Sequence, residues 1–417
     1  MISVIGTGTG EPLSEEARSV LAGAGLAVGA ARHLDAAGLP PRARRLVLGP
    51  LAPALDAIEE YEASDAGPVV VLASGDPGFF GIVRVLAERF GRERLDVRPG
   101  VSSVAAAFAR IGLPWDDAVV VSAHGRALRT AVNVCRSHPK TAVLTGPGAG
   151  PAELGAELAR RSPGRTLVVA SAVGDPVRER VEWLTPAEAA ARTWDAVSVV
   201  LCLESAAGPG PARTVAGPAV GPAGWALPEE EFAHRDSMIT KFEVRALALA
   251  RLGPRLGDLV WDIGAGSGSV AVECARLGAA VVAVEKTADG VARIRDNARA
   301  HGVDVRVVHG DAPTVLSDLS DPDAVFVGGG GEELPAIVAA CARRGPRALV
   351  VAMAALDRVP AVRAALRTAG YAPDGVLLQS SRLAPLPGDV TRLAAANPVF
   401  LLWGVRPPAP AYEGENQ

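Results

Sequence analysis

Lysine, cysteine and aromatic residues are scarce in this 417-residue chain, whose aromatic content is 4%. Only Lys140, Lys241 and Lys286 are lysines among 42 basic residues, so arginine carries nearly all of the positive charge. Basic residues form no long cluster and the formal net charge is −4, which leaves no electrostatic surface for a nucleic acid or an anionic membrane. We therefore expect neither of them as a partner.

The four cysteines, Cys135, Cys202, Cys274 and Cys341, lie 67, 72 and 67 residues apart. This spacing fits neither a zinc site nor a disulfide framework, so we expect no bound metal and a reducing, cytoplasmic compartment. No apolar run approaches the length that spans a bilayer, and no basic or apolar leader precedes the first expected strand, residues 2–5. We expect a soluble protein.

Strand-like and helix-like segments alternate along the chain, which indicates an α/β protein with parallel sheets. Residues 205–228 contain five glycines, five prolines and a single charge, and are predicted to be a linker. We expect residues 1–204 to form two small lobes, about 1–112 and 113–204. Residues 229–405 are expected to form a doubly wound, Rossmann-like sheet, closed at its edge by an antiparallel pair at 375–379 and 399–405, before a tail at 406–417.

In the second half, an apolar strand runs directly into a glycine-rich turn over residues 264–268. Glycines there let backbone N–H groups approach a ligand at the positive end of the following helix. Ser269 stands where the dinucleotide fingerprint has its third glycine, which weakens the case for a pyrophosphate. Glu285 ends the next strand and could accept two hydrogen bonds from a ribose diol, while Asp311 follows the third strand. The combination favours a nucleoside over the alternative that these acids, with Asp262, are helix caps or solvated turns.

These residues resemble a class I S-adenosylmethionine-dependent methyltransferase. Over residues 229–405 the closer resemblance is to the decarboxylating C15-methyltransferases of cobalamin biosynthesis, and segments 231–232, 240–245, 261–269, 310–313 and 325–329 carry it. The resemblance implies a cofactor site at the glycine turn and the two following strand ends. Its residues are Thr240, Gly264, Ala265, Gly266, Ser267, Gly268, Glu285 and Ala312. Asp311 is predicted to join them because it follows the third strand, where it could frame an adenine edge.

In the first half, two strand-to-helix turns, 72–81 and 97–103, combine with residues 122–126 and 144–146. Together they resemble the tetrapyrrole methylase family, specifically its C5-methylating members, over residues 1 to about 204. In that family the cofactor lies folded between the lobes, so the glycine turn at 6–10 is not expected to hold it. The resemblance implies cofactor contacts from Gly75, Asp76, Ser102, Ser103 and Thr145.

Taken together, the two resemblances imply one polypeptide with two methyl-transfer activities on a single macrocycle. Enzymes of this kind methylate C5 and C15 of precorrin-6Y and remove carbon dioxide from the acetate arm at C12, giving precorrin-8. The resemblance implies two S-adenosylmethionine sites and, through the C-terminal region, a homo-oligomer. No nucleophilic side chain is required, because in-line methyl displacement needs alignment and exclusion of water. The catalytic residues stay unassigned, and a single residue could still donate or remove a proton.

The implied substrate carries many carboxylates, which arginine and lysine side chains bind well. Substrate contacts are therefore predicted among polar side chains beside the motifs, with ordinary surface charge as the alternative. These candidates are His124, Arg126, Arg235, Lys241 and Arg245.

Several alternatives stay open. Asp76 could be a turn carboxylate before Pro77, and His124 a structural histidine. The segment 30–33 departs from the family pattern, which has a more basic pair before the histidine, so the roles of Arg32 and His33 are undecided. Competing functions are a pair of nicotinamide-dependent modules, an RNA methyltransferase, an interaction protein with one inactive half, and the same reactions on a cobalt-precorrin.

Overall fold

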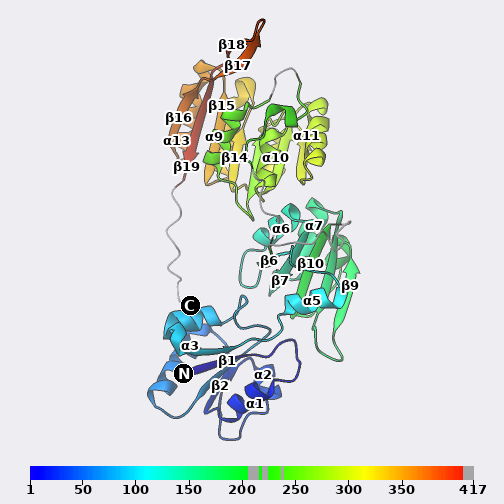
Figure 1. The fold of residues 1–417 in the computed structure, drawn as a ribbon, viewed down its shortest axis with the longest axis vertical. Helices are drawn as coiled ribbons and strands as arrows, with labels where there is room; N and C mark the ends of the chain where they lie inside the picture. Colours follow the sequence, from blue (N-terminus) through cyan, green and yellow to red (C-terminus); the bar gives the residue numbers. More distant parts are fainter. Residues whose placement is uncertain (205–215, 218–223, 236–238, 407–417) are drawn as a thin grey trace. The chain divides into compact units, whose positions relative to one another are not determined.

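The computed structural model describes residues 1–204, 216–217, 224–235 and 239–406 (Figure 1). Most of the predicted linker, 205–228, and residues 407–417 of the predicted tail lie outside the described residues. The chain divides into two compact units, residues 1–128 with 140–217 and residues 129–139 with 218–417. Within the described ranges, no helix is both long and apolar enough to cross a bilayer.

The first sheet of the first unit is wholly parallel, with strand order β3-β2-β4-β1-β5. Its strands are β1 (Ile2–Gly6), β2 (Leu26–Gly29), β3 (Arg44–Val47), β4 (Val69–Ala73) and β5 (Leu95–Arg98). Successive residues of β1 enter different cores: Val4 packs with Ile58 and Leu86, whereas Ile5 packs with Leu21. Helices on both faces explain why the inner strands β1, β2 and β4 are nearly all apolar, whereas the edge strands β3 and β5 carry charged residues. They are α1 (Glu15–Ala22), α2 (Ala31–Ala36), α3 (Leu51–Ala63) and α4 (Val83–Phe90).

The second sheet of this unit has strand order β6-β7-β10-β8-β9. Its strands are β6 (Val119–Ser122), β7 (Lys140–Leu144), β8 (Arg165–Ser171), β9 (Arg180–Leu184) and β10 (Ser198–Glu204). Only the β6–β7 pair is parallel, so the prediction of a parallel layer is wrong for the rest of this sheet. The segment 172–179 between β8 and β9 is too short for a parallel crossover. The helices of this unit are α5 (Ser103–Ile111), α7 (Pro151–Arg161) and α8 (Pro186–Ala190), whereas α6 (Leu128–Ser137) belongs, except for its first residue, to the segment 129–139 of the second unit.

The second unit contains a seven-stranded sheet of order β13-β12-β11-β14-β15-β19-β16. Its strands are β11 (Leu259–Ile263), β12 (Ala280–Glu285), β13 (Val305–His309), β14 (Ala324–Val327), β15 (Ala348–Met353), β16 (Ala372–Leu378) and β19 (Val399–Val405). Strands β11 to β15 pair in parallel, and the predicted antiparallel edge pair is confirmed as β16 with β19. The exposed hairpin of β17 (Ser381–Leu386) and β18 (Val390–Ala395) was not predicted.

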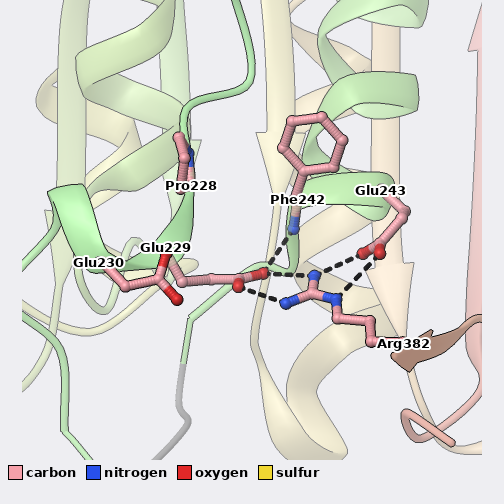
Figure 2. A pocket seen from close by; sticks show the side chains of 6 residues that line it. All are labelled: Pro228, Glu229, Glu230, Phe242, Glu243 and Arg382. Carbon is pink, nitrogen blue, oxygen red and sulfur yellow. Dashed lines mark hydrogen bonds and ion pairs between the residues drawn. The ribbon is translucent and has the colours of Figure 1, made fainter. Parts of the chain in front are cut away.

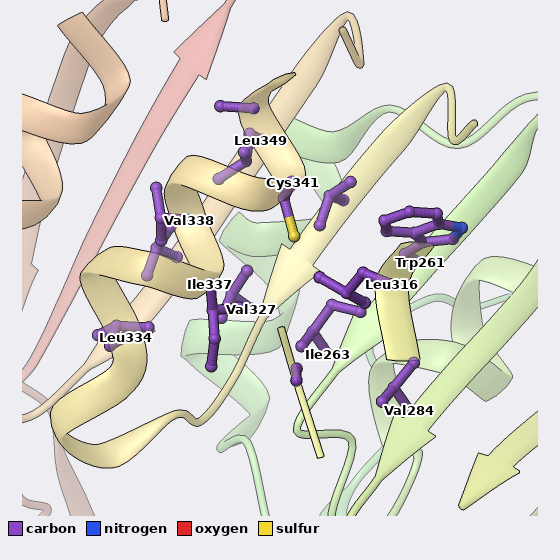
Figure 3. Close-up of a cluster of buried hydrophobic side chains, with 14 of the residues drawn as sticks. Trp261, Ile263, Val284, Leu316, Val327, Leu334, Ile337, Val338, Cys341 and Leu349 are labelled. Carbon is purple, nitrogen blue, oxygen red and sulfur yellow. The ribbon is translucent and has the colours of Figure 1, made fainter. Parts of the chain in front are cut away.

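Alternate residues of β11 fill the cores on the two faces of this sheet. Trp261 and Ile263 belong to the same buried cluster as Leu334 and Ile337 (Figure 3). Val260 belongs to the cluster on the other face. The helices that cover the sheet are α9 (Phe242–Leu252), α10 (Ser269–Arg276), α11 (Ala288–Ala300), α12 (Leu334–Arg343) and α13 (Val359–Thr368). The predicted doubly wound fold is therefore confirmed, and the strand order reverses between β11 and β14, where such sheets bind ligands.

Candidate functional site

The glycine turn after β11 lies at the point where the strand order reverses. Gly264, Gly266 and Gly268 have φ values of +70°, +58° and +73°, a left-handed conformation that side chains disfavour. A Cβ atom on Gly264 would lie 3.0 Å from backbone atoms of Gly329, and one on Gly268 would lie 2.9 Å from Ile294. Above Gly266 there is open space. Two of the glycines thus allow close packing, and the third leaves room for a ligand.

Glu285, at the end of β12, is joined directly to this turn. Its Oε2 accepts the Gly266 N–H at 3.0 Å, and its Oε1 accepts the Thr287 N–H at 2.9 Å and the Thr287 hydroxyl at 2.8 Å. A carboxylate offers about four acceptor positions, so Oε2 retains one for a further donor. The structure brings Glu285 and the turn together as a single site.

The third predicted loop joins the same edge of the sheet. The Gly310 N–H donates to the Glu285 carbonyl at 3.0 Å, which places Asp311 and Ala312 beside Glu285 along the edge. The Asp311 side chain is exposed and Ala312 is buried. An exposed carboxylate at Asp311 and the small apolar side chain of Ala312 could contact the edge and the face of a flat base.

Asp262 is a helix cap, as the alternative interpretation proposed for it. Its buried carboxylate accepts the Ala271 N–H at 3.0 Å in the first turn of α10. Burial raises the pKa of Asp262 to about 7, and the nearby Glu285 charge acts in the same direction. Asp262 supports the start of α10 from within the core and does not line the open side of the turn.

The basic residues before α9 separate into different environments. Arg245 is completely buried; it donates to the carbonyl oxygens of Thr240 at 2.5 Å and of Leu227, and its Nε lies 3.5 Å from the buried Glu273 carboxylate. This contact corrects the prediction that Arg245 binds substrate, because its side chain has no exposed surface. Lys241 is half-buried and Arg235 is exposed.

A small pocket of about 200 Å³ lies near the start of α9 and is occupied by an ion-pair cluster (Figure 2). Arg382, from β17, donates to both oxygens of Glu229 at 2.6 and 2.8 Å and to both oxygens of Glu243 at 3.0 and 2.8 Å. Glu229 also accepts the Phe242 N–H at 2.8 Å. Hydrogen bonds from Arg382 lower the pKa of Glu229 to about 2. The cluster connects the hairpin to α9. It was not predicted from the sequence, because Arg382 lies 139 residues from Glu243 and 153 residues from Glu229.

In the first unit, glycines bring three strand ends together. Gly8 and Gly75 exchange backbone hydrogen bonds of 3.3 and 2.9 Å. A Cβ atom on Gly6 would lie 2.6 Å from both the Gly100 nitrogen and the Gly75 oxygen. The turn at 6–10 therefore packs closely against the loops that follow β4 and β5.

The predicted cofactor residues of the first lobe lie on two of these loops. A Cβ atom on Gly75 would lie 3.6 Å from Ser102 Cα and from the Ser103 nitrogen. The Ser102 hydroxyl accepts the Ala105 N–H at 3.1 Å and caps α5. Asp76 accepts the Gly78 N–H at 2.7 Å, so a turn role is confirmed for this carboxylate.

The remaining predicted residues lie at the end of the second sheet. The buried Thr145 hydroxyl donates to the Ser198 carbonyl at 2.6 Å. His124 packs against Gly146, where a Cβ atom would lie 2.7 Å from the imidazole Nδ1. Both His124 and Arg126 are exposed. Thr145, His124 and Arg126 thus lie on neighbouring loops of one lobe, after β6 and β7.

A polar cluster around His33 in the first lobe was not predicted from the sequence. Thr7 and Ser74, which follow β1 and β4, both hydrogen-bond the imidazole of His33. These residues lie 26 and 41 positions from His33 in the sequence, and only the pairing of β2, β4 and β1 brings them together.

Replacing Arg382 tests the ion-pair cluster. We expect R382Q to lower the free energy of unfolding at neutral pH by about 1–2 kcal/mol, allowing for the partial exposure of the guanidinium. Because the folded pKa of Glu229 is depressed to about 2, its stabilisation is present above pH 4.5, its ordinary value, and is lost as the pH falls toward 2. Urea unfolding between pH 7 and pH 3.5 should show the difference between wild type and variant shrinking.

Arg392 lies on the partner strand of the same hairpin and provides the matched control. R392Q should leave both the stability and its pH dependence unchanged. Equal stability of R382Q and R392Q at neutral pH would contradict the assigned role of the cluster.

Comparison with known proteins places both halves among methyltransferases. Residues 230–405 match a family model described as a precorrin methyltransferase domain, and residues 1–191 match the model of tetrapyrrole (corrin/porphyrin) methylases. The chain is 37% identical over 342 residues to a precorrin-6Y C(5,15)-methyltransferase (decarboxylating) of Sinorhizobium sp, covering 80% of this chain and 79% of the relative.

Two further relatives have related names. The protein of Mycobacterium tuberculosis with the same name is 34% identical over 360 residues, covering 82% of this chain and 83% of the relative. A probable cobalt-precorrin-6B C(15)-methyltransferase (decarboxylating) of Pyrobaculum calidifontis is 37% identical over 183 residues, covering 42% of this chain and 93% of the relative.

Proposed function

Because the chain belongs to the family of decarboxylating precorrin-6Y C5,15-methyltransferases, we propose that it methylates C5 and C15 of precorrin-6Y and decarboxylates the C12 acetate, giving precorrin-8. The observation that carries this proposal is the presence of both halves in one chain, over about four fifths of the relatives' length. Both methyl groups come from S-adenosylmethionine, which methyltransferases of this family use.

Each half is proposed to perform one methylation. Residues 1–204, with their two lobes, are assigned to C5, and residues 229–405 are assigned to C15 and to the decarboxylation. The assignment is supported by the family models, which divide at nearly the same place. Two different folds in one polypeptide are consistent with two distinct reacting positions on one ring.

The residues of the second half fit a sulfonium nucleoside. When bound, S-adenosylmethionine supplies an electrophilic methyl group. The open space over Gly266 would admit it, Glu285 would accept a hydrogen bond from its ribose, and Asp311 with Ala312 would frame its base. The remaining proposed contacts come from the turn and from the segment before α9: Thr240, Gly264, Ala265, Ser267 and Gly268.

A second cofactor site is proposed in the first half. Gly75 packs against the backbone of Ser102 and Ser103. The side chains of these three residues are small, so the end of the sheet offers space for a ligand. Asp76 and Thr145 would contribute from the adjoining turn and from the second lobe. Their hydrogen bonds to Gly78 and Ser198 hold the two loops in defined positions.

Binding and alignment are the contributions we assign to the protein. Arg126, Arg235 and Lys241 are proposed to hold substrate carboxylates, with His124 beside them, because charge-assisted hydrogen bonds fix orientation. Exclusion of water and in-line placement can contribute about 7–11 kcal/mol to such a displacement. In the decarboxylation the conjugated macrocycle accepts the electron pair, so the chain needs only to orient the acetate.

The protein is also proposed to act in the cytoplasm and without nucleic acid. All four cysteines are buried free thiols, which suits a reducing compartment. The net charge of −4 disfavours the alternative of an RNA methyltransferase.

The product of the reaction tests the proposed function. Incubation of the purified chain with precorrin-6Y and methyl-labelled S-adenosylmethionine should yield a tetrapyrrole that has gained two labelled methyl groups and lost one carbon dioxide, as measured by mass spectrometry. A parallel reaction with the cobalt-containing substrate distinguishes the two forms of the pathway. An unchanged tetrapyrrole mass, or label transferred to RNA instead, would overturn the proposal.

Isothermal titration with S-adenosylmethionine tests the two sites. Wild type should bind two equivalents, and E285A should bind one, because the variant removes the carboxylate that organises the turn and accepts from the ribose. E285Q keeps acceptor atoms and should weaken that site only in part.

Asp296, an exposed acid on α11, supplies the control D296A, which should bind two equivalents. In turnover, E285A should lose C15 methylation and retain C5 methylation. Loss of both methylations together would refute the assignment of one reaction to each half.

A homo-oligomer through the C-terminal region is proposed from the β17–β18 hairpin. Leu383 and Leu393 face each other across the two strands, and they are 78% and 68% exposed. The neighbouring Arg382 points to the opposite face, toward its own domain. A two-stranded sheet with unpaired edges is only marginally stable alone, and pairing with the same hairpin of a second copy would bury both leucines symmetrically.

Sedimentation velocity measures the oligomeric state directly. Wild type should sediment as a dimer or larger, and L383K should shift it toward monomer, because burying an unpaired ammonium in the interface is costly. Leu356, which is 65% exposed elsewhere on the same unit, gives the control L356K. A monomeric wild type would end this proposal.

A further inference from the structure

Four polar side chains meet at the carboxyl edge of the first sheet. Thr7 follows β1, Arg32 and His33 belong to α2 after β2, and Ser74 follows β4. Because β2, β4 and β1 are parallel neighbours, their carboxyl ends lie side by side. Ser74 immediately precedes Gly75, so the cluster adjoins the loop proposed to hold the methyl donor of the first half.

The hydrogen bonds of the cluster determine the tautomer of His33. The Thr7 hydroxyl donates to the Ala73 carbonyl at 3.1 Å, so its oxygen is left to accept from His33 Nδ1–H at 3.2 Å. The proton of the neutral ring is therefore on Nδ1, and Nε2 carries a lone pair.

The partners of Nε2 are consistent with this assignment. Arg32 Nε donates toward Nε2 at 3.3 Å, and Arg32 Nη2 donates to the Ser74 oxygen at 2.9 Å. The Ser74 hydroxyl, whose oxygen already accepts from Arg32, donates to Nε2 at 2.6 Å. The Ser74 hydroxyl proton is thus directed at His33 Nε2, and the proton on the far side of the ring is directed from Nδ1 to Thr7.

The environment keeps the imidazole neutral. Partial burial lowers the pKa of His33, and the positive charge of Arg32 lowers it further. Arg32 is the charged group bonded to the ring among the contacts of the described residues. A histidine that is neutral, half-buried and hydrogen-bonded to an exposed hydroxyl can take up a proton.

Methylation of a neutral ring carbon creates a need for such a group. The carbon–sulfur bond breaks with its electron pair remaining on sulfur, and a π electron pair of the macrocycle forms the new carbon–carbon bond. The macrocycle gains one positive charge, so a ring proton must leave for a neutral product to form.

We propose that Ser74 and His33 form the proton relay for the C5 methylation, an inference that rests on the function proposed above. The Ser74 oxygen accepts the proton released by the macrocycle while its own hydroxyl proton passes to His33 Nε2. The imidazolium then returns the proton to solvent. Thr7 positions the ring by holding Nδ1–H, and Arg32 aligns the Ser74 oxygen.

The relay is tested in the full-length enzyme with precorrin-6Y and S-adenosylmethionine. H33Q, which keeps hydrogen-bonding atoms but cannot take up the proton, should slow C5 methylation in a single turnover about 100-fold or more. C15 methylation and decarboxylation in the same chain are the internal control and should be unchanged. S74A should reduce C5 methylation similarly, while the concentration of S-adenosylmethionine giving half-maximal rate stays constant.

The pH profile separates proton transfer from a structural role. In wild type the C5 methylation rate should fall as the pH drops through the pKa of His33, since the protonated ring cannot accept; in H33Q this acidic limb should be absent. A slower H33Q enzyme with the wild-type acidic limb would overturn the relay. Absence of C5 methylation in wild type would instead overturn the proposed function.

Nuclear magnetic resonance provides a readout that does not depend on turnover. The chain has six histidines, so the His33 imidazole signals can be assigned by their loss in H33Q. We expect His33 to titrate below the ordinary histidine value with its proton on Nδ1. Titration above neutral pH, or a proton on Nε2, would contradict the proposal.

Discussion

Close backbone packing between glycine turns at the carboxyl edges of parallel sheets is the constraint on which both candidate sites depend. In the first unit, Gly6 leaves no room for a side chain against Gly75 and Gly100; in the second, Gly264 lies against Gly329. Without these contacts the loops after neighbouring strands would be held apart by side chains. Polar groups on those loops would then not reach a common ligand.

Charged side chains in the second unit mainly stabilise the scaffold around its turn. Asp262 caps α10 from within the core, and the buried Arg245 joins the segment before α9 to Glu273. Arg382 fastens the distant hairpin to Glu229. The catalytic demands of methyl transfer are modest in comparison, because the donor is already activated and the chain has to bind, align and exclude water. A protein of this kind can devote most of its charges to structure.

The two units build their candidate sites on sheets of different topology. The second has a single doubly wound sheet, where the reversal between β11 and β14 opens the edge and Glu285 reaches the turn from β12. The first divides its residues between a parallel sheet and a mostly antiparallel one, so its candidate groups come from two lobes. The His33 cluster belongs to the parallel sheet alone, which is why its residues are bonded to each other without help from the second lobe.

Local pattern determined the parts of this protein that depend on neighbours in sequence. Apolar strands followed by glycine turns identified the loops with Gly75 and Gly264. Two extended segments near the C-terminus likewise predicted the antiparallel edge pair, β16 with β19. Tertiary structure alone decided which distant groups meet. Strand order and helix packing bury Arg245, place Arg382 within hydrogen-bonding distance of Glu229, and bring His33 into contact with Thr7 and Ser74. None of these three contacts leaves a periodic signal in the sequence, since residues far apart in the chain become neighbours only when the sheet has formed.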